Sequence, residues 1–214
     1  LVLFLAPLMG LTLGAQAVAA EREQGTLGYL LAQPVSFLEV FLSKFIGLAI
    51  AISAAIVSGF ALSTLTINFL GGGSGMETFF GLTGLTVLLA LASLSLGYLI
   101  SSVSRRTSTA LGIAIVAWLG LVLIGDLGLM GTAVIMKLSP GQLLGLTLVN
   151  PLEVYRIASI DLLQDSLELL GPSGLVAHKW FGGAIGAVLT AIMLLWIVVP
   201  LGIAYTAMAR QEAR

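Results

Sequence analysis

The sequence predicts an all-α, polytopic membrane protein. Hydrophobic residues make up 58% of the 214 positions and charged residues only 9%, whereas a soluble domain carries about a quarter charged residues. The apolar residues occur in continuous runs and do not alternate with polar ones, which favours helices over membrane strands. The net charge of −1 provides no overall basic field, so we do not expect nucleic acid as a partner.

Five segments are long and apolar enough to span a membrane, since a helix needs about 20 mostly apolar residues to cross roughly 30 Å of hydrocarbon. The predicted spans are residues 1–20, 45–70, 79–101, 110–133 and 181–207. A shorter apolar stretch, 136–149, is interrupted by Lys137, Pro140 and Gln142, so we expect it to be interfacial or re-entrant. Together, residues 1–214 are expected to form a single transmembrane domain.

The charged connections predict the orientation, because Lys and Arg concentrate on the cytoplasmic side of a membrane. One set of alternate connections carries six basic and four acidic residues, a net charge of +2; it comprises 21–44, the Arg105-Arg106 loop and the tail from Met208. The other set carries three basic and six acidic residues, a net charge of −3; it comprises 71–78 and about 125–180. We therefore expect the first set, with the C-terminus, to be cytoplasmic.

This orientation places Leu1 outside. The sequence starts there within an apolar run and without an initiator methionine. We interpret this as a missing N-terminal piece that supplies a sixth, upstream span; a cleaved signal peptide is the alternative, although mature chains seldom begin inside a span.

The expected extracytoplasmic segment, about 134–180, contains a helix of its own. Asn150-Pro151 opens this helix, because Asn caps free amides and Pro is favoured in the first turn, and Gly171-Pro172 ends it. Its apolar stripe consists of Leu152, Ile157, Ile160, Leu163, Leu167 and Leu170, and its wet side of Glu153, Arg156, Asp161, Asp165 and Glu168. The helix either rests on the outer membrane face, which is the simpler interpretation, or docks an extracytoplasmic partner.

Residues 21–44 form a 24-residue connection, which is long for two helices that a few residues can join. The charged triplet Glu21-Arg22-Glu23 leads into a short helix that Pro34 stops; the apolar face of this helix consists of Leu27, Leu30 and Leu31. Ser36 and Glu39 are spaced as a capping box for a second helix, which continues into the next span at Lys44. A short helix held between two spans along the membrane surface is a lever, since a protein that grips it moves both spans.

The run Glu-Arg-Glu-x-Gly-Thr-Leu…Leu-Leu-Ala-x-Pro-Val-Ser…Glu…Lys in this connection resembles the first cytoplasmic loop of ABC-2 type transporter permeases. In that family the loop forms a coupling helix in a groove of the ATPase subunit. Members have six spans and an extracytoplasmic segment between spans five and six, and they work as dimers with two ATPase chains. Span count and loop spacing fit this plan with the first span absent, so the resemblance covers essentially the whole chain.

The resemblance implies ATPase contact at the matched positions Glu21, Arg22, Glu23, Gly25, Thr26 and Leu27. The sequence departs from the commoner pattern at Gly28, where an acid is frequent, and at Phe37, where Arg is frequent, so no specific salt bridge is implied. Within the family, the runs Leu-Leu-Ala-Gln-Pro-Val-Ser and Asn-Pro-Leu-Glu-Val-Tyr-Arg (150–156) resemble the NosY-type permease of the nitrous oxide reductase maturation system. That likeness implies a bacterial inner-membrane exporter that works with an ATPase and a periplasmic accessory protein in assembling a copper–sulfur centre.

The chain shows no nucleotide-binding, catalytic or metal-binding motif. It contains no Gly-Lys pair, so it lacks a phosphate-binding P-loop, and the Gly71–Gly75 run is expected to be an external turn. ATP and Mg are therefore expected on the partner ATPase. Cysteine is absent, His178 is the one histidine, and the six methionines are dispersed, whereas Cu(I) prefers clustered thiolate or thioether ligands. We expect the translocated species to be a sulfur-containing or organic species and not bare copper.

Two further features have open interpretations. Asp126, at the outer end of the fourth span, is a weak candidate for substrate contact, although its flanking glycines also allow it to lie at the wet interface. Small residues at four-residue spacing, Gly10/Gly14 and Gly182/Gly186, permit close helix packing, more often within one subunit than across a dimer.

Other functions compatible with the sequence are an ABC-2 exporter of a lipid, polysaccharide or drug, and a non-transporting membrane anchor of a periplasmic complex. An intramembrane enzyme is disfavoured, because His178 is expected outside the membrane and the acidic residues are dispersed. The expected partners are an ABC ATPase subunit, a second copy of the chain, a periplasmic accessory protein and membrane lipid.

Overall fold

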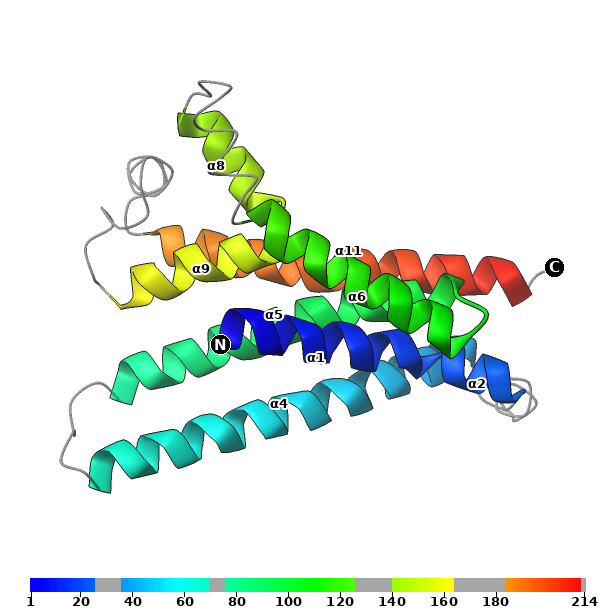
Figure 1. Ribbon diagram of the computed structural model, residues 1–214, viewed down its shortest axis with the longest axis horizontal. Coiled ribbons are helices and arrows are strands. Elements are labelled where there is room, and N and C mark those ends of the chain that lie inside the picture. The colour runs from blue at the N-terminus through cyan, green and yellow to red at the C-terminus, as the bar shows by residue number, and fades with distance from the viewer. Residues whose placement is uncertain (26–35, 70–75, 126–139, 164–183, 213–214) are drawn as a thin grey trace. The chain divides into compact units, whose positions relative to one another are not determined.

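The computed structural model describes residues 1–25, 36–69, 76–125, 140–163 and 184–212. Within these ranges every regular element is a helix (Figure 1), which confirms the all-α fold class. The chain forms two compact units. Unit 1 comprises residues 1–54, 90–119 and 195–214, and unit 2 comprises residues 55–89 and 120–194.

Among the described residues, four helices are long and apolar enough to cross a membrane, and they confirm four of the predicted spans. These stretches are Val2–Gln24, Leu38–Ile67, Thr78–Val103 and Ile185–Arg210. The elements that contain them are α1 (Val2–Ala17) with α2 (Ala19–Gln24), α4 (Phe37–Phe69), α5 (Met76–Val103) and α11 (Ile185–Glu212). The chain is therefore a multi-pass membrane protein.

The fourth predicted span, 110–133, is represented by α6 (Thr107–Leu123), an apolar helix of 17 residues. At a rise of about 1.5 Å per residue, this helix covers roughly 25 Å, which is slightly less than the hydrocarbon thickness. Residues 126–133 lie outside the described residues, so the structure confirms the first part of this span.

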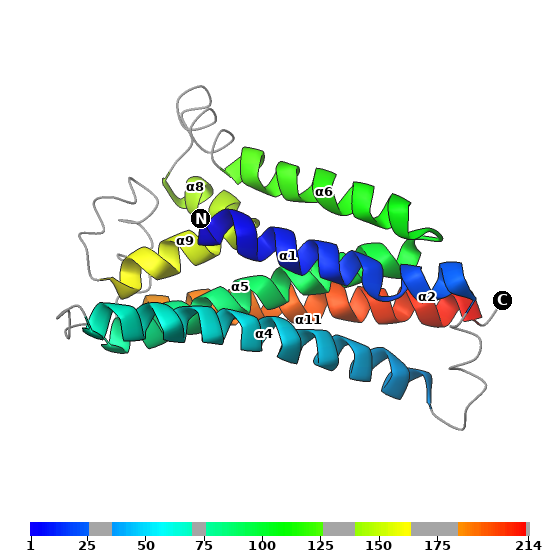
Figure 2. The ribbon, with the colours of Figure 1, turned by 60° about the horizontal axis from the view of Figure 1, so that its bottom comes forward.

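In unit 1, α1 packs along α5 with almost no space between the two backbones (Figures 1 and 2). A methyl group at Gly10 or Gly14 would overlap the α5 backbone between Ala90 and Tyr98, and a methyl group at Gly97 would overlap the α1 backbone. Small residues at such positions let membrane helices approach closely. The predicted role of Gly10/Gly14 is thus confirmed within one subunit, whereas Gly182 lies outside the described residues.

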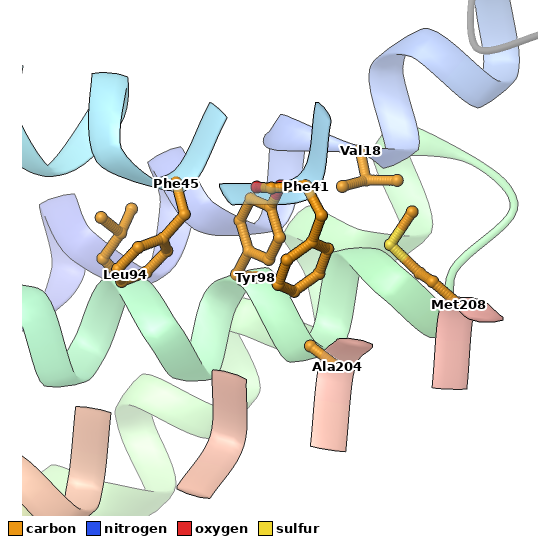
Figure 3. Packing of buried hydrophobic residues seen from close by; sticks show 7 residues of the cluster. All are labelled: Val18, Phe41, Phe45, Leu94, Tyr98, Ala204 and Met208. Carbon is orange, nitrogen blue, oxygen red and sulfur yellow. The ribbon is translucent and has the colours of Figure 1, made fainter. Parts of the chain in front are cut away.

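The core of unit 1 is an apolar cluster drawn from four parts of the chain (Figure 3). Its members are Val18, Phe41, Phe45, Leu94, Tyr98, Ala204 and Met208. The rings of Phe41 and Phe45 meet that of Tyr98 edge-on, with centroid distances of 5.0 and 5.7 Å; such edge contacts stabilise aromatic pairs beyond the area that they bury. The start of α4 is therefore held against α5 and α11.

In unit 2, α9 (Pro151–Leu162) begins at the predicted Asn150-Pro151 opening. The Asn150 side-chain oxygen accepts a hydrogen bond from the Leu152 N–H (3.0 Å), and its Nδ2 donates to the Leu121 carbonyl of α6 (2.7 Å). The preceding helix, α8 (Pro140–Leu148), has nine residues and covers about 14 Å, too little to span a membrane, as predicted for the interrupted stretch. The prediction that this helix continues to Gly171-Pro172 is wrong, because α9 ends at Leu162 with Leu163 as its C-cap; residues 164–183 lie outside the described residues.

The sequence predicts Glu153 on the wet side of α9, and this prediction is wrong, because Glu153 is only 7% exposed. Its carboxylate lies against Gly125, where an added methyl group would come within 2.8 Å of Oε1, and it faces Arg156 at 3.6 Å. Glu153 is buried because the first two turns of α9 are enclosed within unit 2, whereas Arg156 is exposed as predicted.

A buried hydrogen bond also joins α9 to α5 in unit 2. The Tyr155 and Thr86 hydroxyls lie 3.2 Å apart, and the Thr86 hydroxyl donates to the Leu82 carbonyl (2.7 Å). Because Thr86 has one proton to donate, Tyr155 is the donor between the two hydroxyls. Burial raises the pKa of Tyr155, against the opposing effect of the Thr86 hydrogen bond, which keeps this donor protonated.

Candidate functional site

The connection that contains the predicted lever begins with α2, a helix of six residues. The predicted lever helix itself, which carries Leu27, Leu30 and Leu31 and ends at Pro34, lies outside the described residues. Its first amides are satisfied from α5, since the buried Ser101 hydroxyl accepts hydrogen bonds from the Val18 N–H (3.0 Å) and the Ala19 N–H (2.8 Å). The helix ends at Gly25, whose φ of 72° is left-handed. Glycine adopts this conformation without steric cost and is the usual residue at such a helix end.

Glu21 attaches α2 to α4. Its Oε2 atom forms an ion pair with Lys44 Nζ, and the two side chains are 26% and 20% exposed. The same ammonium group donates a hydrogen bond to the Ala17 carbonyl at the end of α1 (3.3 Å). Lys44 therefore binds both the carboxylate of α2 and the backbone just before that helix.

Arg22 attaches α2 to the end of α5. Its NH1 group donates to the carbonyls of Ser102 (3.2 Å) and Ser104 (2.7 Å). The last carbonyls of a helix have no partner within the helix and carry partial negative charge. A guanidinium group supplies both the hydrogen-bond donors and the positive charge that these carbonyls favour, so Arg22 caps the C-terminus of α5.

Glu23 attaches α2 to the start of α6. Its Oε2 accepts a hydrogen bond from the Thr107 N–H (2.9 Å), and Thr107 is the first residue of α6. Free amides and partial positive charge favour a carboxylate at a helix N-terminus. We refer to the three attachments Glu21–Lys44, Arg22–Ser102/Ser104 and Glu23–Thr107 as the α2 clamp.

The second half of the connection confirms the predicted capping box. The Glu39 carboxylate accepts a hydrogen bond from the Ser36 N–H (2.8 Å), and the Ser36 hydroxyl accepts one from the Glu39 N–H (3.3 Å). This reciprocal arrangement satisfies two amides at the start of α4. From Phe37 the helix continues without a break through Lys44 to Phe69.

The apolar core lies directly beside the clamp in unit 1. The buried Tyr98 hydroxyl donates to the Phe41 carbonyl (3.0 Å), one turn before Lys44 on α4. Phe41 also meets the ring of Tyr205 from α11 at a centroid distance of 5.5 Å. The part of α4 that receives the ion pair is thus fixed to α5 and α11 by hydrogen bonding and aromatic packing.

The structure brings together three of the predicted site residues, Glu21, Arg22 and Glu23, and gives Gly25 a defined role in ending α2. Thr26, Leu27 and Asp126 lie outside the described residues. Ser101 and Thr107, the partners of α2, are not evident from the sequence, and Lys44 is evident there only as the end of the connection. The sequence feature that could have indicated these contacts is the polar run Ser101-Ser102-x-Ser104 at the end of an apolar span. The free carbonyls of a helix end need hydrogen-bond donors.

Unit 2 contains an apolar groove of about 420 Å³ between α4 and α5. Its lining consists of Val57, Phe60, Ala61, Thr64, Leu65, Phe79, Phe80 and Thr83. The two threonine hydroxyls donate to carbonyls of their own helices, those of Phe60 and Phe79. The groove therefore presents an almost wholly apolar surface and no charged group.

Comparison with known proteins agrees with this architecture. Residues 1–213 match the model of a family described as "ABC-2 family transporter protein". Two curated relatives, from Stutzerimonas stutzeri and Pseudomonas aeruginosa, carry the name "Probable ABC transporter permease protein NosY".

The first relative is 32% identical over 214 residues, which cover 97% of this chain and 76% of the relative. The second is 34% identical over 164 residues, which cover 74% of this chain and 60% of the relative. Given a family match over nearly the whole length and relatives of this similarity, the chain belongs to the ABC-2 family of transporter proteins and is a permease subunit of an ABC transporter.

Proposed function

We propose that this permease couples ATP hydrolysis by a separate ATPase chain to export across the bacterial inner membrane, and that residues 21–44 receive the force. The observation that carries the proposal is the attachment of α2 to α4, α5 and α6 by three consecutive charged side chains. A displacement of α2 is then delivered to three helices together. The proposed ATPase contacts within this segment are Glu21, Arg22, Glu23, Gly25, Thr26 and Leu27.

The proposed assembly contains two copies of this chain and two ATPase chains, which bind ATP and Mg. The family plan supports this composition. The charge difference between the two sets of connections supports a cytoplasmic position for residues 21–44 and for the C-terminus. An ATPase on that side would meet α2 where the net charge is +2.

We further propose a role in maturation of the copper site of nitrous oxide reductase, together with a periplasmic accessory protein. The NosY name of the two relatives and the matching runs at 30–36 and 150–156 support this role. The proposed cargo is a sulfur-containing or organic species, because the sequence has no cysteine and one histidine. ATP-dependent copper uptake by inverted vesicles that contain the complex would contradict this choice of cargo.

The coupling proposal is tested by co-purifying the full-length permease with its proposed ATPase partner. In the test variant, Gly25-Thr26-Leu27 is replaced by three aspartates, and in the control variant Gly72-Gly73-Ser74 of the opposite connection is replaced in the same way. We expect the first replacement to abolish ATPase association and the control to retain it. Equal association of both variants with the ATPase would remove the coupling assignment.

A further inference from the structure

The set of ATPase contacts proposed above includes Glu21, and the Glu21–Lys44 ion pair assigns that residue a different role. We propose that Lys44 is a positioning residue of the coupling segment and that Glu21 binds Lys44 and does not contact the ATPase. In this proposal the Glu21–Lys44 ion pair fixes α2 relative to α4, and it determines how much of a displacement of α2 reaches α4. The inference rests on the proposed coupling function and assigns a mechanical role to one pair within it.

The first support is the geometry of the pair. Both charged side chains are about three-quarters or more shielded from solvent, so their attraction is weakened less by water and salt than that of a surface pair. Lys44 Nζ also donates to the Ala17 carbonyl, which holds the ammonium group at the junction between α1 and α2. The pair therefore joins the two ends of the connection 21–44, whose intervening residues include the proposed ATPase contacts.

The three residues of the α2 clamp bind three different helices. Arg22 and Glu23 bind the C-terminus of α5 and the N-terminus of α6 through backbone groups. Among the described contacts of the clamp, the contact of Glu21 is the one that reaches α4, where the carboxylate binds the Lys44 side chain. If the pair is broken, α2 keeps its attachments to α5 and α6, and its link to α4 is weakened selectively.

An ATPase contact through Glu21 would be energetically unfavourable. For Glu21 to bind the ATPase, its carboxylate must leave Lys44. The ammonium group would then stay largely buried without that carboxylate, which is unfavourable because a buried charge needs compensation. Glu23 is exposed and meets no such obstacle, so an ATPase contact through the triplet falls on Glu23 more readily than on Glu21.

The test uses charge reversal in the full-length permease. The variants are Glu21→Lys, Lys44→Glu and the double exchange, and Arg210→Glu, an exposed charge near the end of α11, is the control. Four quantities are measured: the thermal unfolding midpoint of the permease alone, the amount of ATPase bound, and kcat and KM for permease-stimulated ATP hydrolysis. Glu21→Gln, Lys44→Gln and their combination form a milder cycle in case a reversal prevents folding.

We expect each single reversal to lower the midpoint and to reduce the stimulated kcat by about threefold or more, with ATPase binding and KM for ATP within about twofold of wild type. The exchange should recover both the midpoint and kcat, and the control should change neither. In the milder cycle, the double variant should lose no more than either single variant, because both remove the same pair.

The proposal is overturned if Glu21→Lys weakens ATPase binding, Lys44→Glu does not, and the exchange restores nothing, since Glu21 would then act on the ATPase. Failure of the wild-type permease to bind an ATPase would instead refute the coupling function. In that case the unfolding midpoint decides whether the ion pair positions α2, because this measurement needs no ATPase. A midpoint that the double exchange restores supports the positioning role of the pair. A midpoint that the double exchange does not restore excludes that role.

Discussion

At Gly25 the backbone takes a left-handed conformation, with a φ of 72° and no neighbouring atom within 4 Å of the place where a methyl group would lie. The need for glycine there is conformational and not spatial. Gly25→Ala is expected to lower stability by about 1 kcal/mol, the usual cost of left-handed backbone for other residues. The measurement is the thermal unfolding midpoint of the full-length permease.

Gly47→Ala is the matched control for this change. Gly47 lies within α4, also has open space around it and has no left-handed φ. Alanine is a better helix former than glycine by about 1 kcal/mol, so this substitution should leave the midpoint unchanged or raise it. A lower midpoint for Gly47→Ala than for Gly25→Ala would contradict the role assigned to Gly25.

Contacts between residues close in sequence could be predicted, and contacts between distant residues could not. Ser36 and Glu39 are three positions apart, so their reciprocal capping follows from helix geometry alone. The same holds for Asn150 and the amide of Leu152. Glu21 and Lys44 are separated by more than 20 residues, and their pairing depends on how α2 and α4 fold against each other.

Close packing of α1 on α5 depends on the absence of side chains at their contact. Gly14→Leu is expected to destabilise the permease by about 1–3 kcal/mol or more, the cost of overpacking, because the added atoms meet the α5 backbone between Leu94 and Tyr98. The loss is measured as the change in the unfolding midpoint in detergent or nanodiscs.

The control for this prediction is Gly112→Leu in α6. Gly112 is also a helical glycine, and the structure places nothing within 4 Å of an added methyl group there. We expect this variant to keep the wild-type midpoint. If the two leucine variants unfold at the same temperature, α1 and α5 do not pack as described.

Asn150 has two roles in unit 2 that substitution can separate. Asn150→Ala removes the cap of α9 and leaves the Leu121 carbonyl without its side-chain donor, so we expect a loss of about 1–2 kcal/mol. Asn150→Ser keeps a capping oxygen and removes the donor to Leu121, and its loss should be smaller. Chemical or thermal unfolding of the purified variants measures both losses; a loss for Ser equal to that for Ala would show that the cap contributes nothing.

The wrong prediction for Glu153 shows why helix periodicity is an incomplete guide to burial. A period of 3.6 residues identifies the polar face of a helix, but it cannot show what the rest of the chain places against that face. Here Gly125, which follows the end of α6 at Leu123, lies directly beside the carboxylate. Arg156, one turn further along α9, is exposed as the periodic pattern predicted.

At the scale of the whole molecule, the membrane spans could be predicted because hydrocarbon thickness dictates a minimum apolar length. Continuous apolar runs predict the ends of α5 and α11 to within about five residues, and they predict the C-terminal end of α4 to within about one residue. Only the start of α4 differs more, because its capping box begins the helix before the apolar run. The partition into two compact units had no signal in the sequence, because it runs through the middle of continuous helices such as α4 (Phe37–Phe69).

The proposed position of residues 21–44 against the ATPase can be measured directly, because the sequence contains no cysteine. Leu27→Cys and, as control on the opposite connection, Ser74→Cys each introduce a single thiol, which a thiol-to-amine reagent can link to the ATPase in the assembled complex. We predict a covalent permease–ATPase product from Leu27→Cys and none from Ser74→Cys. A product from Ser74→Cys, with none from Leu27→Cys, would contradict both the orientation and the coupling role.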